Sequence, residues 1–239
     1  MSEITVSERD YNESNLYYVK SAVADILNGT GSRYDVLRSG SRSVFKVECP
    51  EGYEETLCAE IADKLADVVA INYKYGFFKE KVEAHGLSDR EKDILLAGII
   101  AADLDDDKKY AFDKIKGQSE VAIDGIYNFR LQPLKKKWGE IISYIPTGFP
   151  NTGLKEFIGF LLENKKKRIY IDDGKVYDSH YRRLKKSDLL GGGELSVLKE
   201  VLLSNCGEIE VSGAIPEGDD KYIKEFYGGR IIFSEGYLG

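Results

Sequence analysis

Histidine and cysteine, the side chains that most often bind metal ions or act as nucleophiles, are few and scattered in this sequence. His85 and His180 each stand alone, with no cysteine or second histidine at the spacing of a metal site. Cys49, Cys58 and Cys206 form no C-x-x-C pair, and their odd number argues against a disulfide framework. No G-x-S-x-G motif is present. The sequence therefore predicts no catalytic residues, no metal site and no cofactor.

Two further patterns resemble ion-binding loops but lack their essential residues. The acidic cluster at 103–107 has neither the glycine nor the distal glutamate of a calcium loop, so we interpret it as acids at the start of a helix. Glycines 191–193 precede a helix and could direct backbone amides at an anion. They are not followed by the Lys-Ser/Thr of a P-loop, and a flexible turn is the preferred interpretation.

Charge is distributed unevenly along the chain. The net charge is −7, yet residues 130–186 carry 14 basic and 6 acidic side chains and are the only cationic block. Within it, residues 165–186 interleave tyrosines with three basic clusters. The candidate binding residues of this block are Arg130, Lys135, Lys136, Lys165, Lys166, Lys167, Arg168, Tyr170, Tyr181, Arg182, Arg183, Lys185 and Lys186.

This basic block has more than one interpretation. Lysine and arginine neutralise phosphates and tyrosines stack on bases, so residues 165–186 could bind nucleic acid. The same surface could instead dock an acidic protein or a second copy of the chain. We expect a non-catalytic protein-interaction role with its contact surface within 130–186, and nucleic-acid binding is the alternative.

Residues 123–138, "IDGIYNFRLQPLKKKW", place Arg130 close to the apolar stripe of an amphipathic helix. A buried guanidinium needs a carboxylate partner or several carbonyls, which predicts a structural ion pair. A small-molecule enzyme site near Arg130, assembled from distant residues, is a further alternative. Pro133 predicts either a kink or two successive helices, and if it resets the helix phase, Arg130 is exposed instead.

The periodicity of apolar residues predicts an α+β protein. Residues 1–72 read as a small β-α-β-β-α unit, with a hairpin at 33–48. Residues 73–165 form an almost wholly helical segment that contains a capping box at 88–91. Residues 166–239 follow a β-β-α-β-α-β order with a mixed sheet and an Asp-Gly hairpin turn. These three segments pack together as one or two domains.

The "IDGIYNFRL" stretch, the "EFIGFLLE" helix after it and the ending "YGGRIIFSEG" resemble the YtxC-like family, whose members are described as putative sporulation proteins of endospore-forming bacteria. The sharpest shared element is N-F-R-L at 128–131, and Pro133 with the lysines after it departs from the family pattern. The resemblance implies a cytoplasmic, sporulation-associated protein, and it implies no activity and no catalytic residues.

The composition agrees with a globular protein. Hydrophobic residues make up 42% and charged residues 31%. The polar start "MSEITVSERDYNES" lacks a secretory signal, and no apolar run approaches the roughly 20 residues of a membrane helix. We therefore expect a cytoplasmic location and no membrane partner.

Overall fold

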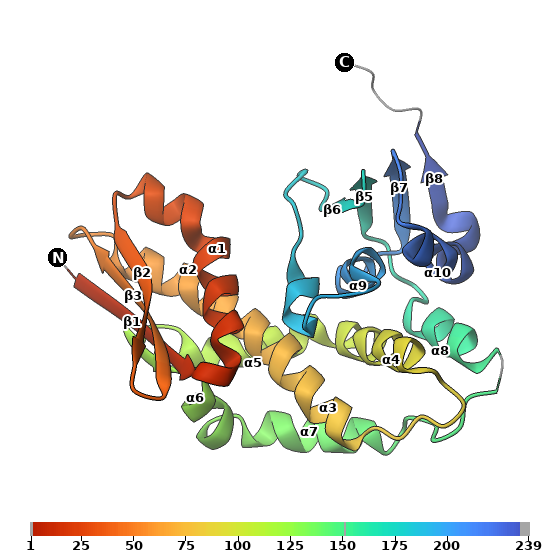
Figure 1. Cartoon of the computed structure of the whole chain (residues 1–239), viewed down its shortest axis with the longest axis horizontal. Helices are drawn as coiled ribbons and strands as arrows, with labels where there is room; N and C mark the ends of the chain where they lie inside the picture. Colours follow the sequence, from red (N-terminus) through yellow and green to blue (C-terminus); the bar gives the residue numbers. More distant parts are fainter. Residues whose placement is uncertain (1, 151, 235–239) are drawn as a thin grey trace. The chain divides into compact units, whose positions relative to one another are not determined.

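The computed structural model of this protein describes residues 2–150 and 152–234. The chain folds as two compact units, each assembled from two separate stretches. Met1–Gly76 and Asp105–Ser143 form the N-terminal unit, and Phe77–Leu104 and Tyr144–Gly239 form the C-terminal unit. Each unit combines helices with a mixed four-stranded sheet, which confirms the predicted α+β class (Figure 1). The helical stretch 73–165 is divided between the two units rather than standing alone.

The sheet of the N-terminal unit follows the strand order β2-β3-β1-β4. Its strands are β1 (Ser2–Arg9), β2 (Arg33–Ser39), β3 (Arg42–Cys49) and β4 (Glu120–Ala122). The expected hairpin is present, because β2 pairs antiparallel with β3, and β4 joins β1 in parallel. Alternate residues of β1 and β3, including Ile4 and Phe45, are buried. The short strand β4 was not expected from the sequence, since three residues are too few for an alternation to be recognised.

Eight helical segments of the described residues belong wholly or partly to this unit. They are η1 (Asp10–Asn12), α1 (Glu13–Gly29), α2 (Glu54–Asp67), the π-helix η2 (Val68–Tyr73), α3 (Lys74–Lys81), α5 (Leu104–Ile115), α6 (Ile123–Phe129) and α7 (Gln132–Ile142), of which η1 is a single 3-10 turn. In η2 the Tyr73 hydroxyl donates to Glu8 Oε2 over 2.7 Å. Glu8 is fully buried at the end of β1, and burial raises the pKa of its carboxyl, although the Tyr73 hydrogen bond opposes that rise.

Pro133 divides the amphipathic stretch into two helices. It lies in the first turn of α7, where its missing N–H costs no hydrogen bond. Leu131, Leu134 and Trp138 remain buried, as the apolar stripe predicts. Arg130 is exposed just after α6 and donates to Gln118 Oε1 over 2.9 Å. The expected buried ion pair of Arg130 is therefore wrong, and the alternative in which Arg130 is exposed is correct.

A buried carboxylate joins three helical segments of the same unit. Asp107 of α5 and Lys74 of α3 are both fully buried, and Lys74 Nζ lies 2.6 Å from Asp107 Oδ2. Trp138 Nε1 donates to the same oxygen over 2.7 Å, and Lys137 Nζ lies 2.6 Å from Oδ1. Asp107 is thus more than a helix-start acid. It neutralises an ammonium group inside the core.

The helices of the C-terminal unit begin with α4 (Asp89–Ala102). Its predicted capping box is confirmed, because the Ser88 hydroxyl accepts from the Glu91 amide while Glu91 Oε2 accepts from the Ser88 amide over 2.8 Å. The remaining helical segments are α8 (Gly153–Leu161), η3 (Lys186–Leu190), α9 (Ser196–Leu203), α10 (Glu217–Tyr227) and η4 (Gly228–Arg230). α4 packs against both α8 and α9, and α9 packs against α10.

The sheet of this unit follows the order β6-β5-β7-β8. Its strands are β5 (Arg168–Asp172), β6 (Lys175–Tyr177), β7 (Glu208–Ser212) and β8 (Ile231–Phe233). The predicted hairpin between β5 and β6 is confirmed, and its turn residues Asp173 and Gly174 have φ of 43° and 71°, as a type I′ turn requires. β7 runs parallel to both β5 and β8. The expected β-β-α-β-α-β order is therefore present.

Candidate interaction surface

One face of the C-terminal sheet is core and the other is open to solvent. Ile169, Ile171, Ile209 and Val211 are buried on the core face. Residues at the alternate positions point the other way and are exposed or half-buried. We call these residues the open sheet face: Arg168, Tyr170, Asp172, Lys175, Tyr177, Glu208, Glu210, Ser212 and Ile232.

Strand register aligns part of this face into a row that crosses all four strands. Tyr177 of β6 lies opposite Tyr170 of β5, which lies opposite Glu210 of β7, which lies opposite Ile232 of β8. Directly opposed side chains on one face contact each other. Ile232 retains 42% of its surface in solvent although it is apolar. The row therefore presents two aromatic rings and an isoleucine around one carboxylate.

Tyr181 extends this aromatic surface from the loop after β6. Its ring stacks on that of Tyr170 with centroids 4.6 Å apart, and 69% of its surface is exposed. The backbone of Tyr181 adopts φ of 56°, which is unfavourable for a bulky side chain. The loop enforces this conformation, because the Tyr181 amide donates to the Asp178 carbonyl over 3.0 Å. The chain thus holds an exposed ring over the sheet at a conformational cost.

Asp178 fixes the loop that carries Tyr181. Its Oδ1 accepts from the backbone amides of His180 and Arg182, and its Oδ2 lies 2.8 Å from the Arg182 guanidinium. Partial burial by itself would raise the pKa of the Asp178 carboxyl, but these hydrogen bonds outweigh it and lower the pKa. The guanidinium of Arg182 is consequently paired with Asp178 within the loop.

Arg168, the cation at the start of β5, is neutralised as well. Arg168 lies 2.7 Å from Glu208 and 3.7 Å from Glu210. The hydrogen bond to Glu208 raises the pKa of the guanidinium, so Arg168 stays charged and paired. Two cationic side chains, Arg168 and Lys175, share the face with three acidic ones, Asp172, Glu208 and Glu210.

The predicted binding residues fall into both units. Arg130, Lys135 and Lys136 belong to the N-terminal unit, where Lys136 lies 4.0 Å from Glu140. Lys135 Nζ lies 3.9 Å from the centroid of the Tyr127 ring, and desolvation lowers the pKa of this lysine.

The other ten predicted residues belong to the C-terminal unit. Of these, the structure brings Arg168, Tyr170 and Tyr181 together at the open sheet face, with Arg182 in the same loop as Tyr181. Lys166, Lys167, Arg183 and Lys185 are exposed, whereas Lys165 and Lys186 are half-buried.

Sequence analysis did not identify Glu210 and Ile232 as surface residues. Glu210 becomes a neighbour of Tyr170, and Ile232 a neighbour of Glu210, only through the parallel pairing of β7 with β5 and β8, and helices separate these strands in the chain. Alternation within β7 is visible in the sequence, but the identity of its neighbours is not.

Side chains that could bind a metal ion do not gather in the part of the chain that the structure describes. No group of three or more histidine, cysteine, aspartate or glutamate residues there has the arrangement of a metal site. The cysteines Cys49, Cys58 and Cys206 are buried and unpaired with one another, and burial raises the pKa of Cys206. Over residues 2–150 and 152–234, no helix combines the length and apolar character needed to cross a bilayer.

Comparison with protein-family models, with curated proteins and with solved structures gives no match to this chain.

Proposed function

We propose that this protein acts without catalysis, as a binding module whose open sheet face contacts another protein. The observation that carries the proposal is the stacked pair of Tyr170 and Tyr181, on the same sheet face as the exposed Ile232. Tyrosine is enriched at protein interfaces and at their energetic hot spots, because it buries a large ring with little loss of side-chain freedom. Tyr181 is exposed and its backbone is strained, and residues held in a strained conformation cluster at binding sites.

The charges of the face support a protein partner over nucleic acid. Nucleic-acid surfaces gain affinity from cations that neutralise phosphates. Here the guanidinium of Arg168 is already paired with Glu208, and the acidic side chains of the face outnumber the basic ones. A phosphate backbone would meet local negative charge at the row that carries the tyrosines.

We also propose a cytoplasmic role during sporulation. Its support is the resemblance of "IDGIYNFRL" to the YtxC-like proteins. A strain that lacks the gene should form fewer heat-resistant spores than its parent, and restoring the gene should restore them. Equal spore counts in the two strains would remove this part of the proposal.

The test of the interaction uses tagged full-length protein expressed in its native cells. Tyr181→Ser removes the exposed ring, and Tyr144→Ser serves as the matched control because Tyr144 is 84% exposed and lies outside the open sheet face. We expect wild type and control to retain a protein that Tyr181→Ser loses. With that partner purified, Tyr181→Ser should weaken its affinity by about tenfold or more in calorimetry.

Two results would contradict the proposal. Equal affinity of wild type and Tyr181→Ser for every co-purified protein would show that the face is not the contact. Tight binding to single-stranded nucleic acid that weakens steeply with salt, and is lost in Tyr181→Ser, would assign the face to nucleic acid instead.

A further inference from the structure

A small pocket lies beside the β5-β6 hairpin of the C-terminal unit, and we call it the hairpin pocket. It has a volume of about 260 Å³ and is lined by the turn residue Gly174, by β6, by residues of the segment 183–188 and by the N-terminal part of α9. α9 packs against both β6 and η3, so elements of one compact unit enclose this space. Sites for whole small molecules measure roughly 300–1,000 Å³, so the hairpin pocket suits a compact chemical group.

Three cationic side chains line the hairpin pocket. Lys175 lies in β6, and Arg183 and Lys185 lie in the segment after it; all three are exposed. None of the three forms an ion pair with any residue that the structure describes. The neighbouring Arg182, by contrast, pairs with Asp178 over 2.8 Å. The hairpin pocket therefore gathers positive charge that no carboxylate of the described chain neutralises by contact.

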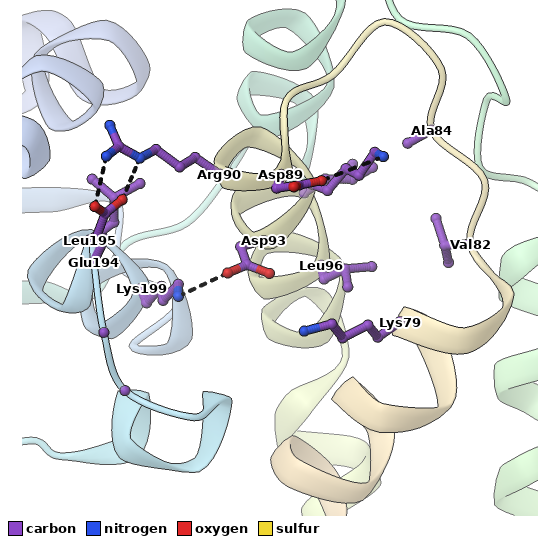
Figure 2. A pocket seen from close by; sticks show the side chains of 14 residues that line it. Lys79, Val82, Ala84, Asp89, Arg90, Asp93, Leu96, Glu194, Leu195 and Lys199 are labelled. Atoms are coloured by element: carbon purple, nitrogen blue, oxygen red, sulfur yellow. Dashed lines mark hydrogen bonds and ion pairs between the residues drawn. The ribbon is translucent and has the colours of Figure 1, made fainter.

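A larger pocket of the same unit, of about 640 Å³, has the opposite arrangement. Figure 2 shows the Lys199 ammonium directed at Asp93, with Nζ 3.3 Å from Oδ2. It also shows the Arg90 guanidinium directed at Glu194, which is 2.7 Å away. Because these charged side chains already pair with each other, they give the larger pocket no preference for a charged ligand.

The buried residue Glu200 holds one wall of the hairpin pocket in place. Glu200 is 3% exposed, its Oε1 accepts from the Lys186 amide over 3.0 Å and its Oε2 accepts from the Ser187 amide over 2.7 Å. Burial raises the pKa of this carboxyl, and the backbone hydrogen bonds oppose the rise. The carboxyl group is thus bound to backbone amides, and it fixes the segment that carries Arg183 and Lys185.

The formal charges of the lining favour an anion. The acidic lining residues are Glu200 and Asp188, and Asp188 is exposed and forms no ion pair within the described part of the chain. Three basic side chains against these two leave an excess of one positive charge even when both acids are ionised. A phosphate monoester carries about −1.5 to −2 charges at neutral pH and accepts hydrogen bonds through three oxygens. Arg183 can donate to two such oxygens at once.

Side chains, rather than the end of a helix, provide the recognition. The Leu198 amide in the first turn of α9 already donates to Asp219 Oδ1 over 2.7 Å, so a carboxylate occupies this helix end. Ser196, the first residue of α9, is exposed at the hairpin pocket and offers a hydroxyl donor. None of the lining residues that the structure describes is aromatic, so a nucleobase would find no ring on which to stack.

The hairpin pocket is continuous with the open sheet face. Lys175 belongs to both, and Arg183 forms a β-bridge with Tyr177, a residue of that face. The loop that holds Tyr181 over the sheet leads directly into Arg183. A protein docked on the open sheet face would therefore bring its own side chains next to the hairpin pocket.

We propose that the hairpin pocket binds a phosphorylated side chain of the protein that docks on the open sheet face. This inference rests on the proposed function and names the feature by which the partner is recognised. The phosphoryl group would lie between Arg183 and Lys185, with Lys175 and the Ser196 hydroxyl at its edge. A phosphorylated side chain fits the small volume better than a complete metabolite does, and arginine clusters are a recurrent means of recognising phosphorylated proteins.

The first experiment titrates the isotope-labelled full-length protein with N-acetyl-O-phosphoserine methylamide and follows the backbone amides by NMR. We expect saturable shifts of the amides of residues 183–188 and 196–197, and no shifts with N-acetylserine methylamide. Arg183→Gln and Lys185→Gln change exposed side chains, and each should weaken binding by about tenfold. Lys155→Gln removes one charge from the exposed surface of α8, outside the pocket lining, and should leave the affinity unchanged.

Four results of this titration would overturn the inference. They are no saturable binding of the phosphoserine derivative, equal shifts with the serine derivative, equal affinities of Arg183→Gln and Lys155→Gln, and tighter binding of inorganic phosphate than of the phosphoserine derivative. The last result would assign the hairpin pocket to a free ion rather than to a side chain.

The second experiment uses the partner that wild type retains and Tyr181→Ser loses. Phosphatase treatment of this partner should weaken its affinity for wild type by about tenfold, and the double variant Arg183→Gln, Lys185→Gln should bind both forms equally. An affinity that phosphatase leaves unchanged would overturn the inference and leave the open sheet face as the contact. A successful phosphoserine titration in the absence of any Tyr181-dependent partner would support the hairpin pocket and refute only the proposed contact face.

Discussion

The buried carboxylate of Asp107 gives the strongest prediction about stability. Asp107→Asn keeps the size of the side chain and an oxygen that can accept from Trp138, but it removes the negative charge. The Lys74 ammonium is fully buried 2.6 Å from that carboxylate, and the substitution removes this negative charge from its side. Breaking a buried ion pair from one side costs about 3–5 kcal/mol, a large part of the 5–15 kcal/mol that stabilises a typical domain.

Two control variants test whether the loss of stability comes from the burial of the ion pair or from any change of charge. Lys137→Met removes another partner of the same carboxylate, but the Lys137 side chain is 41% exposed, so we expect a loss of only about 0–1 kcal/mol. Asp113→Asn removes an exposed pair with Lys116 on the same helix and should have a similarly small effect on the free energy of unfolding.

Trp138 provides a fluorescence signal for measuring the free energy of unfolding. It is the only tryptophan of the chain and contacts Asp107, so its fluorescence during urea denaturation reports unfolding of the N-terminal unit. The reasoning would be refuted if Asp107→Asn lowered the free energy of unfolding no more than Asp113→Asn does. A double variant, Lys74→Met with Asp107→Leu, should recover most of the loss, since no buried charge then remains at either position.

Three further predictions concern local structure. The raised pKa of Glu8 means that the folded state binds the proton of this carboxyl more tightly than the unfolded state does. The contribution of Glu8 to the free energy of unfolding is therefore greatest below about pH 4, and it falls as the pH rises through the raised pKa. Glu8→Gln should flatten this dependence in urea denaturation between about pH 4 and 7, and an unchanged slope would contradict the argument. Ser88→Ala removes the cap of α4 and should cost about 1 kcal/mol in thermal unfolding, whereas Ser88→Asp should cost little. Gly207→Ala would drive its Cβ into the carbonyl oxygen of Lys165 and should cost at least about 2 kcal/mol, with Gly139→Ala, in open space on α7, as the harmless comparison.

Local signals account for most of what the sequence predicts correctly. The Asp173-Gly174 turn, the Ser88 capping box and the alternation of β3 each depend on residues close in sequence. The break at Pro133 also follows from local chemistry, because a proline is tolerated in a first helical turn and not in an interior one.

Long-range pairing accounts for what could not be predicted. Lys74 and Asp107 meet in the core although neither lies in a motif, and an isolated lysine within a helical pattern normally indicates a solvated face. Glu210 and Ile232 join Tyr170 only through the sheet register. The larger pocket likewise combines Lys199 with Asp93, two residues of different helices whose separation in the chain leaves no repeat or spacing to detect.

The division of each unit into two stretches has a consequence for synthesis at the ribosome. Residues 77–104, which include α4 of the C-terminal unit, emerge before β4, α6 and α7 of the N-terminal unit. Neither hydrophobic core is complete when the first hundred residues have been made, so nascent chains of that length should expose α4 until α8 and α9 follow. For the same reason a single cleavage cannot release either unit whole, and fragments for expression have to be designed by joining distant segments.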